Sequence, residues 1–302
     1  MTVVSMNLVI PTLVLYLARI FNGLLMILLP IGWGFFIWRR YQTSWRLWWI
    51  GVGTMILAQI GHIPFNYGLT YLFKVGVLPN PPAAWALVFN AVVLGLSAGV
   101  WEESFRYFAF RWWAKERRSY DKALMMGAGH GGIEAIVLGA YVLYVFFQMA
   151  ALRNMDLTQA FSGERAAALQ QQLQVYWSVP WYTALAGALE RFNALIFHLT
   201  AAVLVLQVFL RKQIRWLWLA ILWHAALDGL AVGLAPQGIG VVEGALVIFT
   251  LVNLWLLYKL RRSGMESGEA DGQMPAPVRA DPSSLPGMTE SPENLEDSRF
   301  SG

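Results

Sequence analysis

Seven long apolar segments account for most of this 302-residue chain. Each is close to or longer than the roughly 20 residues that a helix needs to cross the hydrocarbon of a bilayer. Repeated runs of this length are typical of helical membrane proteins. The sequence therefore predicts an all-α, polytopic membrane bundle. The expected spans cover residues 8–37, 47–68, 84–111, 122–149, 180–210, 216–235 and 240–258.

The composition agrees with a membrane bundle. Charged residues make up 13% of the sequence, about half of the quarter that is usual in soluble domains. The absence of Cys excludes disulfides and thiolate ligands. Segment 263–302 differs, because it holds eight acidic residues and two arginines and is rich in Gly, Pro and Ser. We expect it to be a disordered acidic cytoplasmic tail after a transmembrane bundle over 1–262. The partner indicated is the lipid bilayer, not nucleic acid.

Lysine and arginine are concentrated in alternate connections between the predicted spans. Connections 38–46, 111–122 and 211–215 are densely basic, as is the start of the tail, whereas the other connections hold only three basic residues. The positive-inside rule places the basic connections in the cytoplasm. The sequence therefore predicts a multi-pass protein of the cell membrane with its N-terminus outside and its C-terminus inside. The long external connection 152–179 should form a short amphipathic helix.

Ionisable side chains recur inside four of the predicted spans. A charge at the bilayer centre costs about 2.5–3.5 kcal/mol on insertion scales, so such residues should be paired and face the bundle interior. Residues four or seven apart share one face of a helix. On this basis each of the four helices presents one polar pair: Glu102 with Arg106, His130 with Glu134, Arg191 with His198, and His224 with Asp228.

These pairs also agree in depth. With a rise of about 1.5 Å per residue, Glu102, His130 and His224 lie roughly 12–14 Å from the basic residues at the ends of their spans. His198 lies deeper, roughly 20 Å from its basic end. One such pair could be a structural clamp between helices. Four pairs at matched depth favour a functional cluster that faces the bundle interior.

The motifs that hold these residues resemble those of a known family. EESFR, GAGHGGIEA, ERFNALIFH and HAALDG follow one another on successive helices, and in this order they resemble the YhfC family of intramembrane proteases. That family is similar to the clan of CAAX prenyl proteases, bacterial CPBP proteins and PrsW. The resemblance covers about 85–233, which would be a four-helix catalytic core. Arg106 follows the second glutamate by three residues rather than the clan's usual four, and His130 is followed by Glu134 where the clan usually reads F-x-x-x-H.

The resemblance implies peptide-bond hydrolysis on membrane-associated protein or peptide substrates. Glu102 would be the general base, and Glu103 would order Arg106 or a neighbouring helix. His130 and His224 would hold the water or donate to the oxyanion. The remaining predicted site residues would orient these groups or complete the ring: Arg106, Glu134, His198 and Asp228.

The same inventory of side chains could also bind a metal. Histidines with carboxylates suit zinc, which takes three protein ligands and a water in catalytic sites. If a metal is used, the expected ligands are His130, His224 and Glu102. The chain has no H-E-x-x-H motif, so both metal-dependent and metal-free hydrolysis remain open.

Three other functions compete with the peptidase. Buried Glu, His and Arg also line ion- or proton-coupled transporters, although no internal repeat is evident here. A haem protein could use two of His130, His198 and His224, but the acids at the same level argue against it. A non-catalytic membrane scaffold of the same fold is the third alternative.

Two of the other ionisable residues within the predicted spans, His62 and Arg19, have separate interpretations. We interpret His62, which comes just before Pro64, as a structural residue. Arg19 has no acid on its own span, so we expect it to pair with Glu190 or Glu243.

Overall fold

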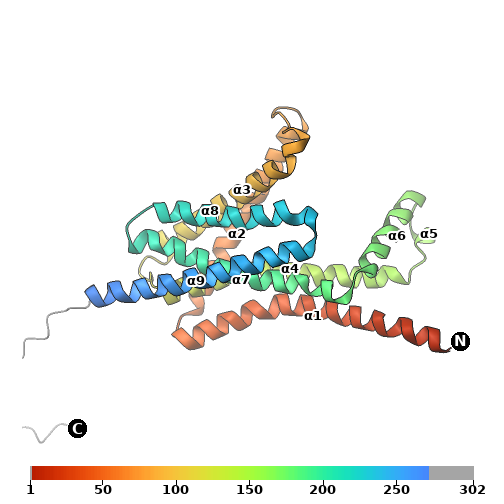
Figure 1. Ribbon diagram of the computed structural model, residues 1–302, viewed down its shortest axis with the longest axis horizontal. Coiled ribbons are helices and arrows are strands. Elements are labelled where there is room, and N and C mark those ends of the chain that lie inside the picture. The colour runs from red at the N-terminus through yellow and green to blue at the C-terminus, as the bar shows by residue number, and fades with distance from the viewer. Residues whose placement is uncertain (1, 272–302) are drawn as a thin grey trace, which may run out of the picture. The chain divides into compact units, whose positions relative to one another are not determined.

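The computed structural model describes residues 2–271, with side chains from Leu13 to Arg261, and the described part contains helices and no strand (Figure 1). The prediction of an all-α fold is therefore confirmed. The long helices are α1 (Thr2–Tyr41), α2 (Trp45–Lys74), α3 (Ala86–Phe108), α4 (Tyr120–Arg153), α7 (Ala186–Leu210), α8 (Arg215–Leu234) and α9 (Ile239–Asp271). Shorter elements are α5 (Leu157–Ala160), α6 (Gly163–Ser178), the 3₁₀ turns Ala83–Trp85, Trp181–Leu185 and Ala235–Gln237, and the π-helical turn Ala109–Trp113.

Six helical segments of the described residues are long and apolar enough to cross a membrane, so the chain is a multi-pass membrane protein. They are Leu13–Tyr41, Ala83–Trp113, Tyr120–Arg153, Trp181–Leu210, Arg215–Gln237 and Ile239–Arg261. The seventh expected span, 47–68, forms most of α2 but does not belong to this set. Gln59, His62 and Asn66 follow one another within α2 and lower its hydropathy. That 47–68 crosses the bilayer stays a prediction.

Helix α7 forms the centre of the bundle. In its most apolar stretch 83% of the residues are buried, compared with 33% or less in the other five spans. Apart from a few polar residues, its sequence is apolar, as expected for a helix that is surrounded by others. α4 packs against α1, α2 and α7, and α3 packs along α8. The four helices predicted to form the core therefore do contact one another, and α2 joins them.

Two glycines allow α2 and α4 to approach each other closely. A Cβ atom on Gly51 would lie 2.0 Å from the carbonyl oxygen of Met126, and one on Gly129 would lie 1.9 Å from that of Trp48. Small residues of this kind permit close contact between membrane helices. This contact brings α2 within hydrogen-bonding reach of His130 on α4.

Gly51→Ala is therefore expected to destabilise the bundle. Its new methyl group would overlap the α4 backbone, and overpacking of this kind typically costs about 1–3 kcal/mol. Gly53→Ala on the same helix is the matched control, because nothing lies within 4 Å of its Cβ position. Thermal unfolding in detergent micelles should show a lower midpoint for Gly51→Ala alone. Equal midpoints for the two variants would contradict this account of the α2–α4 contact.

The connection between α4 and α7, which the sequence predicts to be external, contains a helix as expected, and this helix is α6. The Arg19 side chain of α1 donates to the carbonyl oxygen of Tyr176, and its guanidinium carbon lies 3.5 Å from the centre of the Tyr176 ring. The expected pairing of Arg19 with Glu190 or Glu243 was therefore wrong. A backbone carbonyl and an aromatic face take the place of the carboxylate.

The predicted C-terminal tail lies largely outside the described residues. Helix α9 continues to Asp271, and residues 272–302 are not described. Residues 263–271 are helical as part of α9, contrary to the predicted disorder, whereas the disorder of 272–302 and the cytoplasmic location of the tail stay predictions.

Candidate active site

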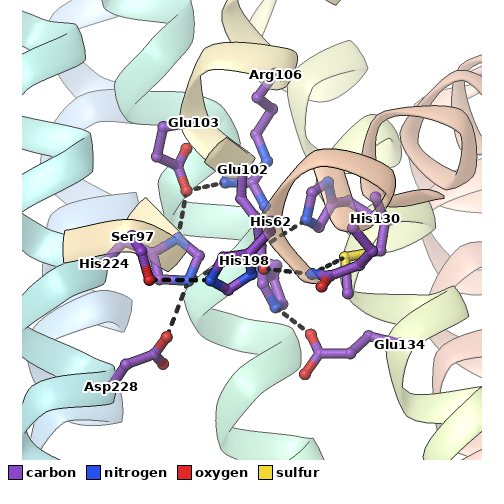
Figure 2. A network of polar contacts seen from close by, with 12 residues as sticks. His62, Ser97, Glu102, Glu103, Arg106, His130, Glu134, His198, His224 and Asp228 are labelled. Carbon is purple, nitrogen blue, oxygen red and sulfur yellow. Dashed lines mark hydrogen bonds and ion pairs between the residues drawn. The ribbon is translucent and has the colours of Figure 1, made fainter. Parts of the chain in front are cut away.

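Side chains from α2, α3, α4, α7 and α8 form one polar network inside the bundle (Figure 2). α3, α4, α7 and α8 supply the eight residues singled out from the sequence, and α2 adds others. The structure brings all eight together: Glu102, Glu103, Arg106, His130, Glu134, His198, His224 and Asp228. Their catalytic roles stay predictions, but their shared, inward-facing position is a property of the fold.

The centre of the network is almost entirely closed to solvent. Glu103, Arg106 and His130 are 0% exposed, and Glu102 is 5% exposed. Charged groups this deeply buried are expected only where a partner compensates each charge. A group whose charge and lone pairs are already taken up by partners is a poor catalyst, so the partners of each group indicate which side chains could act in catalysis.

Glu103, not Glu102, is the partner of Arg106. Nη1 of Arg106 donates to Oε1 of Glu103 one helical turn away. Nη2 of Arg106 donates to Nδ1 of His198 on α7 over 2.9 Å. The four-residue spacing predicted that Glu102 pairs with Arg106, but Arg106 contacts Glu103 and His198 instead. The expectation that Glu103 orders Arg106 agrees with this geometry.

His198 uses both of its ring nitrogens in hydrogen bonds. An arginine can only donate, so Nδ1 of His198 accepts from Arg106. Nε2 of His198 then carries the proton and donates to Oε2 of Glu134 over 2.8 Å. Glu134 also accepts from Arg191. The polar pair predicted within α4, His130 with Glu134, is thus replaced by contacts from Glu134 to α7.

His130 presents a lone pair to Glu102. The hydroxyl of Thr54 donates to the carbonyl oxygen of Gly51 over 2.6 Å, so its oxygen accepts from Nδ1 of His130 over 2.8 Å. In the neutral ring Nε2 is then an acceptor, and it lies 2.9 Å from Oε2 of Glu102. Two acceptors at this distance require a proton or a cation between them.

His224 is oriented in a similar way. Its Nδ1 lies 2.7 Å from Oε1 of Glu103. Because that carboxylate is ion-paired with Arg106, it is the acceptor and His224 the donor. Nε2 of His224 then faces two carboxylates, Oε2 of Glu102 at 3.7 Å and Oδ2 of Asp228 at 3.6 Å. Both distances are too long for hydrogen bonds.

The charges of the network do not cancel. Arg106 neutralises Glu103, and Arg191 neutralises Glu134. Glu102 and Asp228 have no arginine or lysine partner among the described residues. Two carboxylates therefore face the Nε2 atoms of two histidines without a fixed cation. Glu102 is buried, so its charge needs a proton or a bound cation, whereas the Asp228 side chain is 38% exposed.

The donor atoms fit a zinc ion in kind and in spacing. Ligand atoms of Glu102, His130 and His198 lie within 4.8 Å of one another. The set expected from the sequence had His224 in place of His198. The spacing holds for the group with His198, but both nitrogens of His198 are already hydrogen-bonded. We favour His224, whose Nε2 atom makes no hydrogen bond among the described residues and lies 3.7 Å from Oε2 of Glu102. A histidine whose other nitrogen donates to a carboxylate or hydroxyl is the usual form of a metal ligand.

Comparison with known proteins agrees with this geometry. The family model described as YhfC intramembrane metalloprotease matches residues 25–252. The chain belongs to the YhfC intramembrane metalloprotease family. The resemblance seen in the four motifs is thereby confirmed, and the match extends over all eight network residues.

One relative of this chain is the uncharacterized membrane protein YhfC of Bacillus subtilis strain 168. It is 27% identical over 253 residues, which are 80% of this chain and 94% of that protein. No solved structure shows a significant match.

Helix α2 supplies site residues that the sequence did not reveal in this YhfC family member. Thr54 fixes the tautomer of His130, and Nε2 of Gln59 donates to Oε1 of Glu102 over 3.1 Å. The interruption of the apolar pattern of α2 by Thr54, Gln59 and His62 was the available signal. His62 contacts Ser97 and Asn66, consistent with its interpretation as structural.

Thr54→Val should weaken the site without unfolding the protein. Valine keeps the shape of threonine but cannot accept the hydrogen bond from Nδ1 of His130. Loss of such an orienting contact typically costs 10–100-fold in metal affinity or activity. Competition with a zinc chelator measures the affinity, and Thr54→Ser, which keeps the hydroxyl, is the control. Equal zinc affinity in both variants would show that Thr54 does not orient His130 toward a metal.

Proposed function

We propose that this chain is an active intramembrane peptidase. Its active site contains Glu102 and hydrolyses peptide bonds of membrane-associated proteins. The observation that best supports this is the convergence of the Nε2 atoms of His130 and His224 on Oε2 of Glu102, at 2.9 and 3.7 Å. A polar cavity of about 90 Å³ adjoins these groups and is lined by Glu102, His198, His224 and Asp228 among others. The cavity offers room for water beside a carboxylate that has no arginine partner.

The chain's own residues account for the proton transfers of hydrolysis. Glu102 takes the proton of the attacking water and returns it to the leaving amine. Glu103 holds His224, and Thr54 holds His130, so both imidazoles keep a fixed orientation. His130, His224 and Glu102 are the residues that would hold a zinc ion, which would supply a Lewis acid to polarise the scissile carbonyl. In that case Asp228, which faces the same cavity, is the carboxylate left to accept the proton.

Comparative membrane proteomics tests this function. Cells that lack the native protein would express either the wild type or Glu102→Gln at equal levels. Under the proposal at least one membrane protein accumulates uncut only with the variant, and its cut fragments appear only with the wild type. Identical fragment patterns in the two cell lines would refute peptidase activity at Glu102.

The transporter remains the alternative from another class, since the buried network also resembles a proton relay. Proton uptake in vesicles that hold the purified protein would favour this alternative if no substrate is cut.

We infer from the basic connections that the C-terminus is cytoplasmic and the connection that contains α6 is external. A phosphatase reporter, active only outside the cytoplasm, should be inactive after Arg262 and active when inserted at Gln170. The reverse pattern of reporter activity would show that the protein has the opposite orientation in the membrane.

A further inference from the structure

A second cavity reaches Glu102 from the side of the bundle. It has a volume of about 830 Å³ and lies between α2 and α4. Its walls are aliphatic, with Ile56, Ile60 and Ile63 from α2 and Val137 and Leu138 from α4. We call this cavity the lateral groove. It is within the size range of sites that bind ligands.

The lateral groove and the polar cavity meet at two carboxylates. Glu102 and Glu134 line both of them. Glu102 therefore faces an apolar volume on one side and a polar volume on the other. A reaction between a membrane-embedded chain and water needs this arrangement, because each reactant is stable in only one of the two environments.

A proline in α2 supplies a feature that suits a peptide. Pro64 lines the groove and lies inside α2. It has no N–H, so the carbonyl oxygen of Ile60, four residues earlier, lacks its usual helical donor. An unpaired carbonyl at membrane depth is costly. An extended peptide carries backbone N–H groups that could pair with it, whereas a lipid acyl chain has none.

The outer walls of the groove are open to the surroundings of the bundle. Ile60 and Ile63 on α2 are 65% and 63% exposed, and Val137 on α4 is 58% exposed. A chain could therefore enter sideways between these helices without passing through the polar cavity.

We propose that the lateral groove binds an apolar, locally extended segment of the substrate and delivers its backbone to Glu102, while water arrives through the polar cavity. This inference rests on the proposed peptidase function and adds to it the class of substrate and the route of entry. The required chemistry is an aliphatic segment whose helix is broken near the cleaved bond, because backbone N–H groups inside a helix are already paired.

Single-cysteine variants can test binding directly, because the chain has no native Cys. Val137→Cys places a thiol in the groove. Val92→Cys, on α3 and outside it, is the matched control, since the two valines are 58% and 51% exposed. Both changes are made together with Glu102→Gln, which prevents cleavage. The probes are three thiol-bearing molecules in lipid vesicles: a Leu-rich peptide of about 20 residues, the same peptide with a central Gly-Pro, and a phospholipid with a thiol in its acyl chain.

Disulfide formation with the Gly-Pro peptide should be about tenfold greater at Val137→Cys than at Val92→Cys. The unbroken Leu-rich helix should show a smaller preference, and the phospholipid should show none. Equal yields with the Gly-Pro peptide at both positions would overturn the inference. The same preference for Val137→Cys with the phospholipid would also overturn it, because the groove would then be a lipid site.

A second measurement separates this inference from the peptidase function. Val137→Trp should fill the groove and slow cleavage of the Gly-Pro peptide about tenfold, whereas Val92→Trp should not. If the wild type cleaves the peptide and both tryptophan variants cleave it equally fast, the lateral groove does not bind substrate, but the peptidase function is supported. If cross-linking is selective but the wild type cleaves neither peptide nor any cellular protein, the function fails and the groove remains a peptide-binding site.

Discussion

Glu102→Gln is expected to lower the rate of peptide cleavage by about 10²–10⁴-fold, the usual contribution of a general base. Glutamine keeps the shape of glutamate and can still accept the hydrogen bond from Gln59. It cannot take a proton from water. Thermal stability in detergent micelles should therefore stay close to that of the wild type, while initial rates of fragment release fall.

Glu103→Gln provides the control, because it makes the same chemical change one residue away. Glu103 is the counter-charge of a fully buried arginine and the acceptor for His224. Its loss should lower the unfolding temperature as well as the activity. Cleavage by Glu102→Gln at the wild-type rate would exclude Glu102 as the base. If both glutamates proved dispensable at normal stability, the peptidase assignment would fall with them.

Bound zinc, measured by elemental analysis of the same variants, distinguishes the two roles open to Glu102. Replacement of a metal ligand lowers the zinc content of the protein. Replacement of a base that does not bind the metal leaves the zinc content unchanged. A lower zinc content in Glu102→Gln would assign proton transfer to Asp228. Asp228→Asn should then lose activity but keep zinc.

Arg106→Met is expected to cause the largest loss of stability in the chain. Arg106 is 0% exposed and links Glu103 on its own helix to His198 on α7. Removing one member of a buried ion pair typically costs about 3–5 kcal/mol, because the other charge is left uncompensated. Thermal unfolding in micelles should show a strongly lowered midpoint and poor recovery of folded protein.

The double variant Arg106→Met with Glu103→Gln tests the cause of that loss. It removes both charges, so part of the stability should return relative to Arg106→Met alone. If the double variant is less stable than the wild type by the sum of the two single effects, the charges do not interact and the pairing seen here is not the source of stability. A single Arg106→Met variant as stable as the wild type would contradict the burial of an ion pair at this position.

The sequence alone determined the class of the fold and the inward stripe of polar residues. Apolar runs long enough to cross a bilayer specify membrane helices, because no other local structure pairs every backbone group within the run. Residues such as His224 and Asp228, four apart, must share a helix face whatever surrounds the helix. The four motifs also resembled those of the YhfC family, and the family model confirmed that resemblance.

The tertiary structure alone decided which partner each of these residues has. Spacing on one helix suggested Glu102 with Arg106 and His130 with Glu134. The contacts instead join Glu103 to Arg106 and Glu134 to Arg191 and His198. The cause is that helical phase fixes the direction of a side chain but not the helix that lies opposite it. Arg106 can reach either glutamate, and the position of α7 selects one arrangement by placing His198 beside its guanidinium.

Helix α2 shows the same limit most clearly. Thr54 and Gln59 look like ordinary polar interruptions of an apolar run, and nothing local relates them to Glu102 or His130. They reach the site only because Gly51 and Gly129 let α2 and α4 pack closely. The sequence thus determined which polar side chains face inward from α3, α4, α7 and α8. Only the packing of one helix on another decided which lone pairs remain free for chemistry, because that depends on contacts between residues far apart in the chain.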